Sequence, residues 1–435
     1  MARKMKDSGI EWIGEIPTDF SLYKLKYLLS SPLCYGANES GILYSDILPR
    51  YIRITDISPN GTLKNSGMLS LDESSAQNYM LHEGDILFAR SGATVGKSFI
   101  YHNYYGRAAY AGYLIKASFN RLVLPEFVYY YTCSSAYEIW KNSIFIQSTI
   151  QNIGADRYSN LPISVPNSID KQLRIVRYLN NFCSKFDAII YNLQTSIEDY
   201  KKLKQAVITQ AVTKGVRGER EMKDSGVEWI GEIPKEWGRT KIKMIASFFN
   251  GDRTSRYPQP SDFVDSGVAF LTSRNIDSDE VDLSETKYIT DDKYKSLSGA
   301  KIQIDDIIFC LRGSVGKCAI NRTLSCGTVA SSLATIRPKD IYPEYLLYFL
   351  LSNIASTQTT IFMNGTCAAN LSAESVGNYY ITLPISAEQK EIANYLDAKC
   401  AEIDGLIAKK EQLVKELESY KKSLIYEVVT GKREV

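Results

Sequence analysis

One stretch near the start of the chain, Met5-Lys-Asp-Ser-Gly-Ile-Glu-Trp-Ile-Gly-Glu-Ile-Pro17, recurs as Met222-Lys-Asp-Ser-Gly-Val-Glu-Trp-Ile-Gly-Glu-Ile-Pro234. Between residues 5–20 and 222–237, 12 of 16 positions are identical, and the offset of 217 residues is half of the 435-residue chain. This period is that of a whole domain, which excludes a solenoid of short repeats. The sequence therefore predicts two copies of one scaffold.

The same offset reappears further along each half. Eleven residues between 172 and 213 match their counterparts between 389 and 430 without a gap, beginning with Gln172 and Gln389. Similarity between these two anchors is weak. Each half is therefore expected to have a repeated frame around a divergent middle, so that two copies of one scaffold present two different surfaces.

The second anchor predicts a long helix in each half. The segment 170–214 has neither Pro nor Gly, and apolar residues recur in it every seven positions, as they do in its counterpart. A sustained heptad pattern indicates a coiled-coil seam, and about 44 residues at ~1.5 Å each make a rod of about 65 Å. The alternative is two separate amphipathic helices, each packed on its own domain. The predicted seam residues are Leu179, Phe186, Ile190, Leu193, Ile197, Leu396, Ile403, Ile407, Leu417 and Leu424.

The divergent middles predict short strands mixed with helices. Apolar runs suggest strands at 51–55, 85–89, 98–101, 268–272, 304–310 and 332–337. Pro125 and Pro343 each stand where proline is favoured, in the first turn of a helix. Each half is thus a mixed α+β domain.

Composition restricts the chemistry. With 51 Lys+Arg against 49 Asp+Glu, the net charge of +2 excludes a wholly basic, histone-like protein but not local basic surfaces. The only two histidines are His82 and His102, so chemistry shared by both halves cannot use histidine. The eight cysteines form no C-x-x-C and are expected to be reduced. No signal core or membrane-length apolar run is present, and we expect a cytoplasmic protein without membrane contact.

A glycine-rich stretch, Arg90-Ser-Gly-Ala-Thr-Val-Gly-Lys-Ser98, superficially resembles a phosphate-binding loop. Only three residues separate Gly92 from Gly96, however, and the second copy, Gly313-Ser-Val-Gly316-Lys317, is shorter still. A phosphate-binding loop needs four residues there to wrap its N–H groups around phosphates. Two readings remain: a turn that offers Arg and Lys to a nucleic acid, and a tight turn whose cations face solvent.

Two polar loops offer further candidates for base contacts: the segment from Gln147 to Arg157 and the segment from Asn364 to Asn370. Asn and Gln can pair with adenine through two hydrogen bonds, and Arg can do so with guanine, although ordinary polar loop chemistry explains the same residues. The chain is enriched in tyrosine, with 30 residues, and tyrosines such as Tyr104, Tyr105, Tyr110 and Tyr113 could stack on bases or line phosphates, but core and rim packing explains most of them. The predicted contact residues are Arg53, Arg90, Ser91, Thr94, Lys97, Gln151, Asn152, Arg157, Arg274, Asn275, Arg312, Ser314, Lys317, Thr366 and Asn370.

Together, the repeated S-G-I/V-E-W-I-G-E-I-P motif, the two variable middles and the two long helices resemble the type I restriction–modification specificity (S) subunits, over essentially the whole chain. The resemblance implies an α+β fold in which two tandem target-recognition domains (1–166 and 216–384) are separated and joined by two long helices (167–215 and 385–435) that form an antiparallel coiled coil. Each domain would read one part of a bipartite DNA target, and the helices would set the spacing between the parts.

The resemblance also implies the partners. The chain itself would be non-catalytic and would bind double-stranded DNA together with two methyltransferase subunits, which the helices would dock. Motor-nuclease subunits would join the full complex. No metal or cofactor is expected on this chain, since S-adenosylmethionine, ATP and Mg²⁺ would bind the partner subunits. The near-neutral charge predicts modest DNA affinity for the chain alone.

Two other classes of protein remain as alternatives. A tandem coiled-coil adaptor that binds only protein would share the long helices. A self-contained nuclease or methyltransferase would need a donor pocket or a metal cluster, and neither a G-x-G-x-x-G after a strand nor an Asn/Asp-Pro-Pro-Tyr/Phe tetrapeptide occurs.

Overall fold

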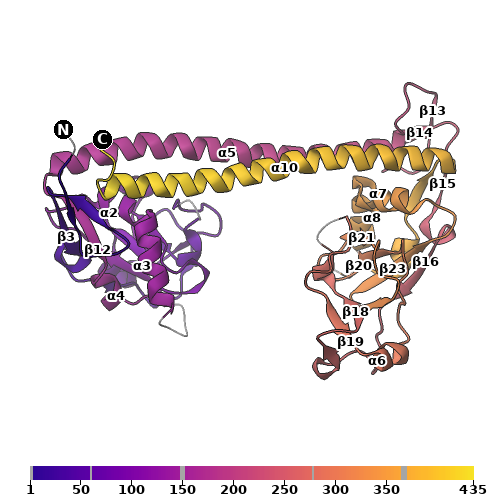
Figure 1. The fold of residues 1–435 in the computed structure, drawn as a ribbon, viewed down its shortest axis with the longest axis horizontal. Coiled ribbons are helices and arrows are strands. Elements are labelled where there is room, and N and C mark those ends of the chain that lie inside the picture. Colours follow the sequence, from indigo (N-terminus) through magenta and orange to yellow (C-terminus); the bar gives the residue numbers. More distant parts are fainter. Residues whose placement is uncertain (1–2, 59–60, 147–151, 277–278, 364–369) are drawn as a thin grey trace. The chain divides into compact units, whose positions relative to one another are not determined.

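The two long helices are each a single uninterrupted element (Figure 1). Helix α5 spans Ile169–Lys214, 46 residues, and α10 spans Ser386–Val429, 44 residues. The computed structural model describes residues 3–58, 61–146, 152–276, 279–363 and 370–435. Each helix ends beside a glycine with positive φ, Gly215 at 78° and Gly431 at 74°, as expected of a left-handed helix cap.

The chain divides into two compact units, and each unit contains half of both long helices. Unit 1 comprises Met1–Gln194 and Gln412–Val435, and unit 2 comprises Thr195–Glu411. The domains predicted at 1–166 and 216–384 are therefore each completed by helix segments from both halves of the sequence.

Within each unit the two helix halves run antiparallel. In unit 1, Asp187 pairs with Lys421, while the end of α10 lies beside the strand that precedes α5, where Ser164 Oγ donates to Val429 O. Unit 2 repeats both contacts: Lys204 Nζ lies 2.8 Å from Asp404, and Thr382 Oγ1 donates to Val212 O at 2.6 Å. The two ion pairs occupy equivalent positions of the repeat.

The predicted seam residues all lie on the covered sides of the helices. Six are buried and four are half-buried. The buried ones are Leu179, Ile190, Ile197, Leu396, Ile403 and Leu424, and the half-buried ones are Phe186, Leu193, Ile407 and Leu417. Full burial of a side chain of this size stabilises a fold by about 1.5–3 kcal/mol.

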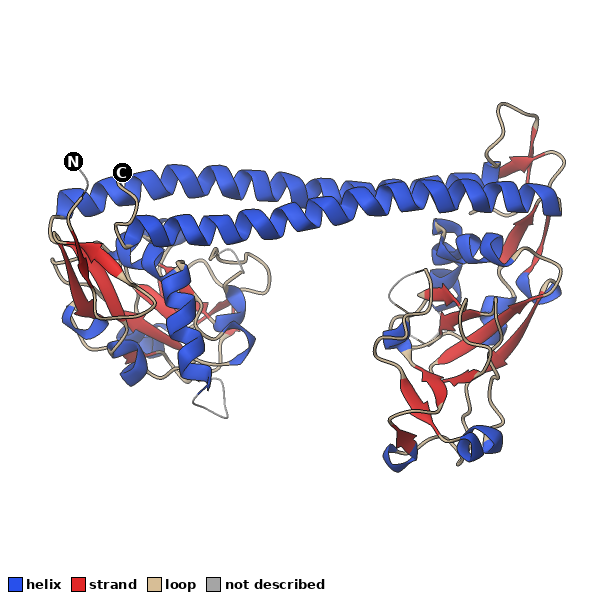
Figure 2. Ribbon diagram, viewed as in Figure 1, coloured by secondary structure: helices blue, strands red, loops and turns tan. Residues whose placement is uncertain are grey.

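Unit 1 contains a hairpin, two four-stranded sheets and a two-stranded ladder (Figure 2). In order across each sheet these are β1 (Met5–Asp7) and β2 (Glu15–Pro17); β10 (Ala108–Tyr110), β6 (Arg50–Ile52), β7 (Leu69–Ser70) and β5 (Ile42–Leu43); β4 (Cys34–Tyr35), β11 (Leu114–Ala117), β8 (Ile86–Ala89) and β9 (Ser98–Ile100); β12 (Pro162–Pro166) and β3 (Phe20–Lys24). Its short helices are α1 (Glu73–Ala76), α2 (Pro125–Thr132), α3 (Ser135–Ile146) and α4 (Ala155–Ser159).

Unit 2 has the same set of sheets. These are β13 (Met222–Asp224) and β14 (Glu232–Pro234); β15 (Gly238–Lys241) and β24 (Tyr380–Leu383); β16 (Ala246–Asn250), β23 (Leu333–Pro338), β20 (Ile307–Cys310) and β21 (Cys318–Ile320); β17 (Phe263–Val264), β19 (Lys287–Ile289), β18 (Val268–Leu271) and β22 (Gly327–Val329). Its short helices are α6 (Asp291–Ser296), α7 (Pro343–Leu351), α8 (Asn353–Met363) and α9 (Ala373–Gly377).

The divergent middles therefore share one topology despite their weak sequence similarity. In each unit a strand pairs in parallel with a later one, β6 with β10 and β18 with β22. Two predicted strands were too long. Of the segment 51–55, only Tyr51 and Ile52 belong to β6, because Ile54–Asp56 forms a 3-10 turn. Of the segment 304–310, only Ile307–Cys310 forms β20, because Asp305 has a φ of 67°.

The repeated residues make the same contacts twice. Gln172 is buried, and its Nε2 donates to Pro166 O at 3.0 Å while its Oε1 accepts from Leu124 N at 2.8 Å. Gln389 does the same with Pro384 O at 2.9 Å and Tyr342 N at 2.8 Å. This side chain joins the start of each long helix to the chain before α2 or α7, which explains why it recurs in both halves.

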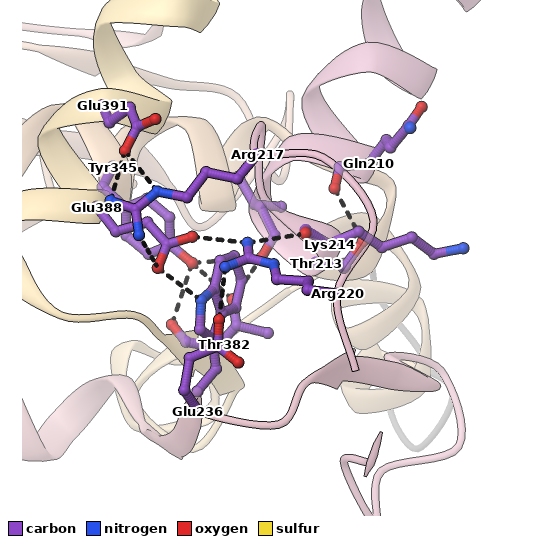
Figure 3. A network of polar contacts seen from close by, with 12 residues as sticks. Gln210, Thr213, Lys214, Arg217, Arg220, Glu236, Tyr345, Thr382, Glu388 and Glu391 are labelled. Carbon is purple, nitrogen blue, oxygen red and sulfur yellow. Dashed lines mark hydrogen bonds and ion pairs between the residues drawn. The ribbon is translucent and has the colours of Figure 1, made fainter. Parts of the chain in front are cut away.

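In unit 2, a buried carboxylate at the start of α10 lies at the centre of a network of hydrogen bonds and ion pairs (Figure 3). Glu388, with a side chain 2% exposed, accepts from Arg220 Nη2 at 2.6 Å and from the Trp237 indole N–H at 3.0 Å. Arg220 also donates to Lys214 O at 3.0 Å, so the network joins the end of α5, the two residues that flank the repeated motif and the start of α10. In unit 1, Arg3 likewise donates to Gly431 O at 3.0 Å.

We expect Glu388→Ala to destabilise unit 2 by about 3 kcal/mol, because Arg220 and the Trp237 N–H lose their shared buried acceptor. For a unit of this size the unfolding temperature should fall by about 6–12 °C in a calorimetric scan. The matched control is Glu391→Ala, since that carboxylate is 44% exposed in its ion pair with Arg217. Equal losses from both variants would contradict this account of the network.

Candidate nucleic-acid interface

The two glycine-rich turns are hairpin turns, not phosphate-binding loops. They connect β8 to β9 and β20 to β21, so no helix follows either turn. Gly92 and Gly96 have φ of 77° and 81°, and Gly313 and Gly316 have 75° and 91°. Only glycine adopts this region without strain, which accounts for the spacing of the glycines in both copies.

The polar loops return to these turns in both units. Ser91 forms a β-bridge with Asn152, and Arg312 forms one with Asn370. Beside each bridge lies an equivalent backbone hydrogen bond, from Ile153 N to Arg90 O at 2.9 Å and from Leu371 N to Leu311 O at 3.0 Å. The structure thus brings together candidates that lie about 60 residues apart in sequence.

Strand register fixes which residues of the two turns are equivalent. Ala89 N donates to Lys97 O and Cys310 N to Lys317 O, each at 2.8 Å, so Ala89 corresponds to Cys310. Arg90 therefore corresponds to Leu311, and Ser91 to Arg312. The two arginines occupy different places in the shared frame.

The remaining candidates at these turns lie at or near the surface. Thr94 and Lys97 are half-buried, and Ser314, Lys317, Arg312 and Asn370 are exposed, as is Arg157 on α4. Gln151 and Thr366 lie outside the described residues. The roles of these residues in binding stay predictions.

Arg53, Arg274 and Asn275 belong to a different feature, the 3-10 turn that follows β6 or β18. The Arg53 guanidinium is held by Asp56, with Nη2 2.8 Å and Nε 3.0 Å from its carboxylate. Arg274 is exposed, with a side chain 79% accessible, and lies 3.8 Å from Glu285.

The burial of Asn275 contradicts its assignment as a DNA contact. It is 1% exposed, and its Oδ1 accepts from Thr272 N at 2.8 Å. Its amide group donates to Asp282 O at 2.9 Å and to Thr286 Oγ1 at 3.1 Å. Asp56 caps the equivalent turn of unit 1 by accepting from Arg53 N, so this position maintains the turn.

One residue near the unit 1 turn was missed by the sequence analysis. Tyr35 on β4 lies under Arg90, with the guanidinium carbon 4.9 Å from the ring centroid. The Tyr35 hydroxyl accepts from Ala155 N at 3.0 Å, which fixes the ring to the start of α4. No local pattern joins two residues this far apart, and only the enrichment in tyrosine pointed towards such contacts.

Other tyrosines near this unit differ in their exposure. Tyr113 is 62% exposed, and its carbonyl accepts from Arg90 N at 3.1 Å, so its ring emerges beside the same turn. Tyr110 is buried in the core. Burial first, and then the hydrogen bond with Tyr104, raises the pKa of Tyr105 to about 12, so this phenol stays neutral at physiological pH.

Among the described residues, no group of three or more His, Cys, Asp or Glu is placed to hold a metal ion. Within that same part of the chain, no helix has both the length and the apolar character needed to cross a membrane.

Comparison with known proteins adds an independent result. The family model of the type I restriction modification DNA specificity domain matches residues 49–199 and 234–416. The MjaVIII specificity subunit of Methanocaldococcus jannaschii, a type I restriction enzyme subunit, is 23% identical over 360 residues, which cover 81% of this chain and 80% of that protein. A putative MjaX specificity subunit of the same organism is 26% identical over 441 residues, covering 97% and 95%.

A solved structure from work on complex assembly and conformational transition of the type I R-M system is similar in fold. Its TM-score is 0.69 at 15% identity, with 96% of this chain and 99% of that chain covered. The predicted fold class, two α+β domains with an internal repeat and two long helices, is confirmed.

The neighbouring residues Arg274 and Asn275 allow a sharp test of structural against binding roles. We expect Asn275→Ala to destabilise unit 2 by about 1–3 kcal/mol, because the hydrogen bonds of a buried side-chain amide are lost. Arg274→Ala should leave the unfolding temperature unchanged and weaken binding to mixed-sequence duplex DNA, measured by fluorescence anisotropy at low salt. A stable Asn275→Ala variant with a selective binding defect would reverse this assignment.

Proposed function

The chain belongs to the type I restriction–modification DNA specificity family, and on this premise we propose that it is the sequence-specificity subunit of a type I restriction–modification complex. Each unit reads one part of a bipartite DNA target. The observation that supports this most directly is that one frame is built twice with different side chains at equivalent positions, such as Arg90 in one unit and Leu311 in the other.

The long helices set the distance between the two parts of the target. They are continuous, so a change in their length is passed on in steps of ~1.5 Å per residue. One heptad is about 10.5 Å, or about three base pairs at ~3.4 Å each. Each added base pair lengthens the spacing by one step and also rotates the groove. The helices therefore select one particular whole number of base pairs.

The same helices dock two methyltransferase subunits. Support comes from exposed apolar side chains that recur at equivalent positions of the repeat: Ile189 with Leu406, and Leu203 with Tyr420. They are 46%, 36%, 48% and 52% exposed in that order. A twofold pattern of apolar positions suits two copies of one partner.

The chemistry belongs to the partner subunits in this proposal. The chain is non-catalytic, and S-adenosylmethionine is bound by the methyltransferase subunits. Motor-nuclease subunits that use ATP and Mg²⁺ join the full complex. The net charge of +2 supports a division in which the methyltransferase subunits supply many of the phosphate contacts.

Sequencing of methylated bases tests this function directly. A host that expresses the partner methyltransferase should carry a split adenine-methylation motif when this chain is present and lose it when the gene is deleted. Re-expression of the intact chain is the control for the deletion. Persistence of every methylation motif after deletion would refute the proposal.

The proposal that the helices set the spacing is tested by inserting one heptad in each helix at the boundary of the two units, after Gln194 and after Glu411. We expect the gap in the methylation motif to lengthen by about three base pairs or recognition to be lost, because the groove face also rotates. The letters of both half-motifs should stay unchanged. A changed letter in either half would show that the helices do more than set spacing.

A further inference from the structure

In unit 1 the shared frame carries an arginine, Arg90, where unit 2 has a leucine. The equivalent residue of unit 2, Leu311, is fully buried and packs in the core. Arg90 occupies that position with its Nε inaccessible to solvent and, among the described residues, without a hydrogen-bond partner. Burying an unpaired donor is unfavourable, so a role outside folding explains the arginine better than packing does.

The aromatic ring under Arg90 is also particular to unit 1. Tyr35 pairs with Ile115 in the β4–β11 ladder, and Ile115 pairs with Phe88. In unit 2, Phe309 is the equivalent of Phe88, and it pairs with Ala334, which in turn pairs with Asn250. Tyr35 thus corresponds to Asn250, and the stacked pair occupies the positions of a leucine and an asparagine in unit 2.

The stacking orients the guanidinium. Its carbon lies 4.9 Å from the Tyr35 ring centroid, and the ring is held by the hydrogen bond from Ala155 N. Of the three guanidinium nitrogens only Nε is shut off from solvent, so the two terminal nitrogens form the accessible edge. A fork fixed in one plane can donate two parallel hydrogen bonds.

A hydrogen-bond acceptor without a partner lies on the segment that is bridged to Ser91. Asn152 Oδ1 is also inaccessible and without a partner in the described part of the chain, and its backbone is bridged to Ser91, next to Arg90. Two buried polar atoms without a partner on adjoining segments show that the polar groups beside the accessible edge of Arg90 are not explained by folding alone.

We propose that Arg90 reads a guanine in the half-site of unit 1, donating from both terminal nitrogens to O6 and N7, and that Tyr35 positions it for this contact. The inference rests on the proposed function and names one base of that target. A planar fork, oriented by an aromatic ring, matches the two acceptors of guanine in the major groove better than the tetrahedral oxygens of a phosphate. Unit 2 has Leu311 and Asn250 at the equivalent positions, so we expect no such contact from them.

The test uses the complex of this chain with its methyltransferase subunits and duplexes that carry its methylation motif. Replacing each guanine in turn with 7-deazaguanine removes only the N7 acceptor. At one position in a single half-site we expect wild-type affinity to fall by about 5- to 150-fold when guanine is replaced by another base, and by a smaller factor for 7-deazaguanine. With the Arg90→Ala variant, each of these two replacements of the guanine should reduce affinity by only about 2-fold or less.

Tyr35 variants separate positioning from general structure. Tyr35→Leu should reduce discrimination at that same base pair by about 2- to 30-fold and leave other base pairs unaffected. Tyr35→Phe keeps the ring but loses the hydrogen bond from Ala155 N, and it should retain most of the discrimination. Equal loss at all base pairs from Tyr35→Leu, or equal loss from both variants, would show a merely structural role.

A phosphate contact predicts a different outcome. Arg90→Lys would then preserve affinity, and Arg90→Ala would weaken binding to all sequences alike, with the slope of log affinity against log salt reduced by about 0.9. Arg312→Ala is the matched control and should affect only the other half-site. If the wild-type complex shows no sequence preference, the proposed function fails; if it does and Arg90→Ala keeps every preference, this inference alone fails.

Discussion

The structure depends on the antiparallel pairing of half of α5 with half of α10 inside each unit. In unit 1 the core that contains Leu179 also contains Leu424 and Val428, which lie more than 200 residues later. In unit 2, Ile208 and Val212 share a core with Leu396. Neither contiguous half of the sequence supplies a complete core, so the helices belong to the domains as much as they connect them.

This constraint explains which residues recur. Several of the repeated positions hold the long helices in place: Gln172 and Gln389 join the helix starts to the preceding chain, and the Asp187–Lys421 and Lys204–Asp404 ion pairs join α5 to α10. The ion pairs near the start of each long helix are less strictly repeated. Glu388 accepts from Arg220 in unit 2, whereas Asp19 lies between Arg3 and Lys171 in unit 1. The Arg3–Asp19 pair has its counterpart in Arg220–Glu236, so only the third position reverses its charge, from Lys171 to Glu388.

With the frame fixed in this way, the turns on the sheets are free to differ. The β8–β9 and β20–β21 turns use glycines of positive φ in the same places, yet the residues beside them are Arg90 and Ser91 in one unit and Leu311 and Arg312 in the other. Backbone hydrogen bonds do not depend on side-chain identity. A sheet register can therefore be kept while the surface chemistry changes, which is what two different half-sites require.

The sequence by itself determined the repeat, the extent of α5 to within a residue or two and the glycine-rich turns. These features are local or periodic, and period and spacing are written directly along a chain. Only the tertiary structure decided that Ser91 meets Asn152, that Tyr35 lies under Arg90 and that Asn275 is buried as a turn cap. Such contacts join residues that different strands bring together, and burial depends on what packs over a residue. Sheet register and packing arise from the whole fold, so no single stretch of sequence contains them.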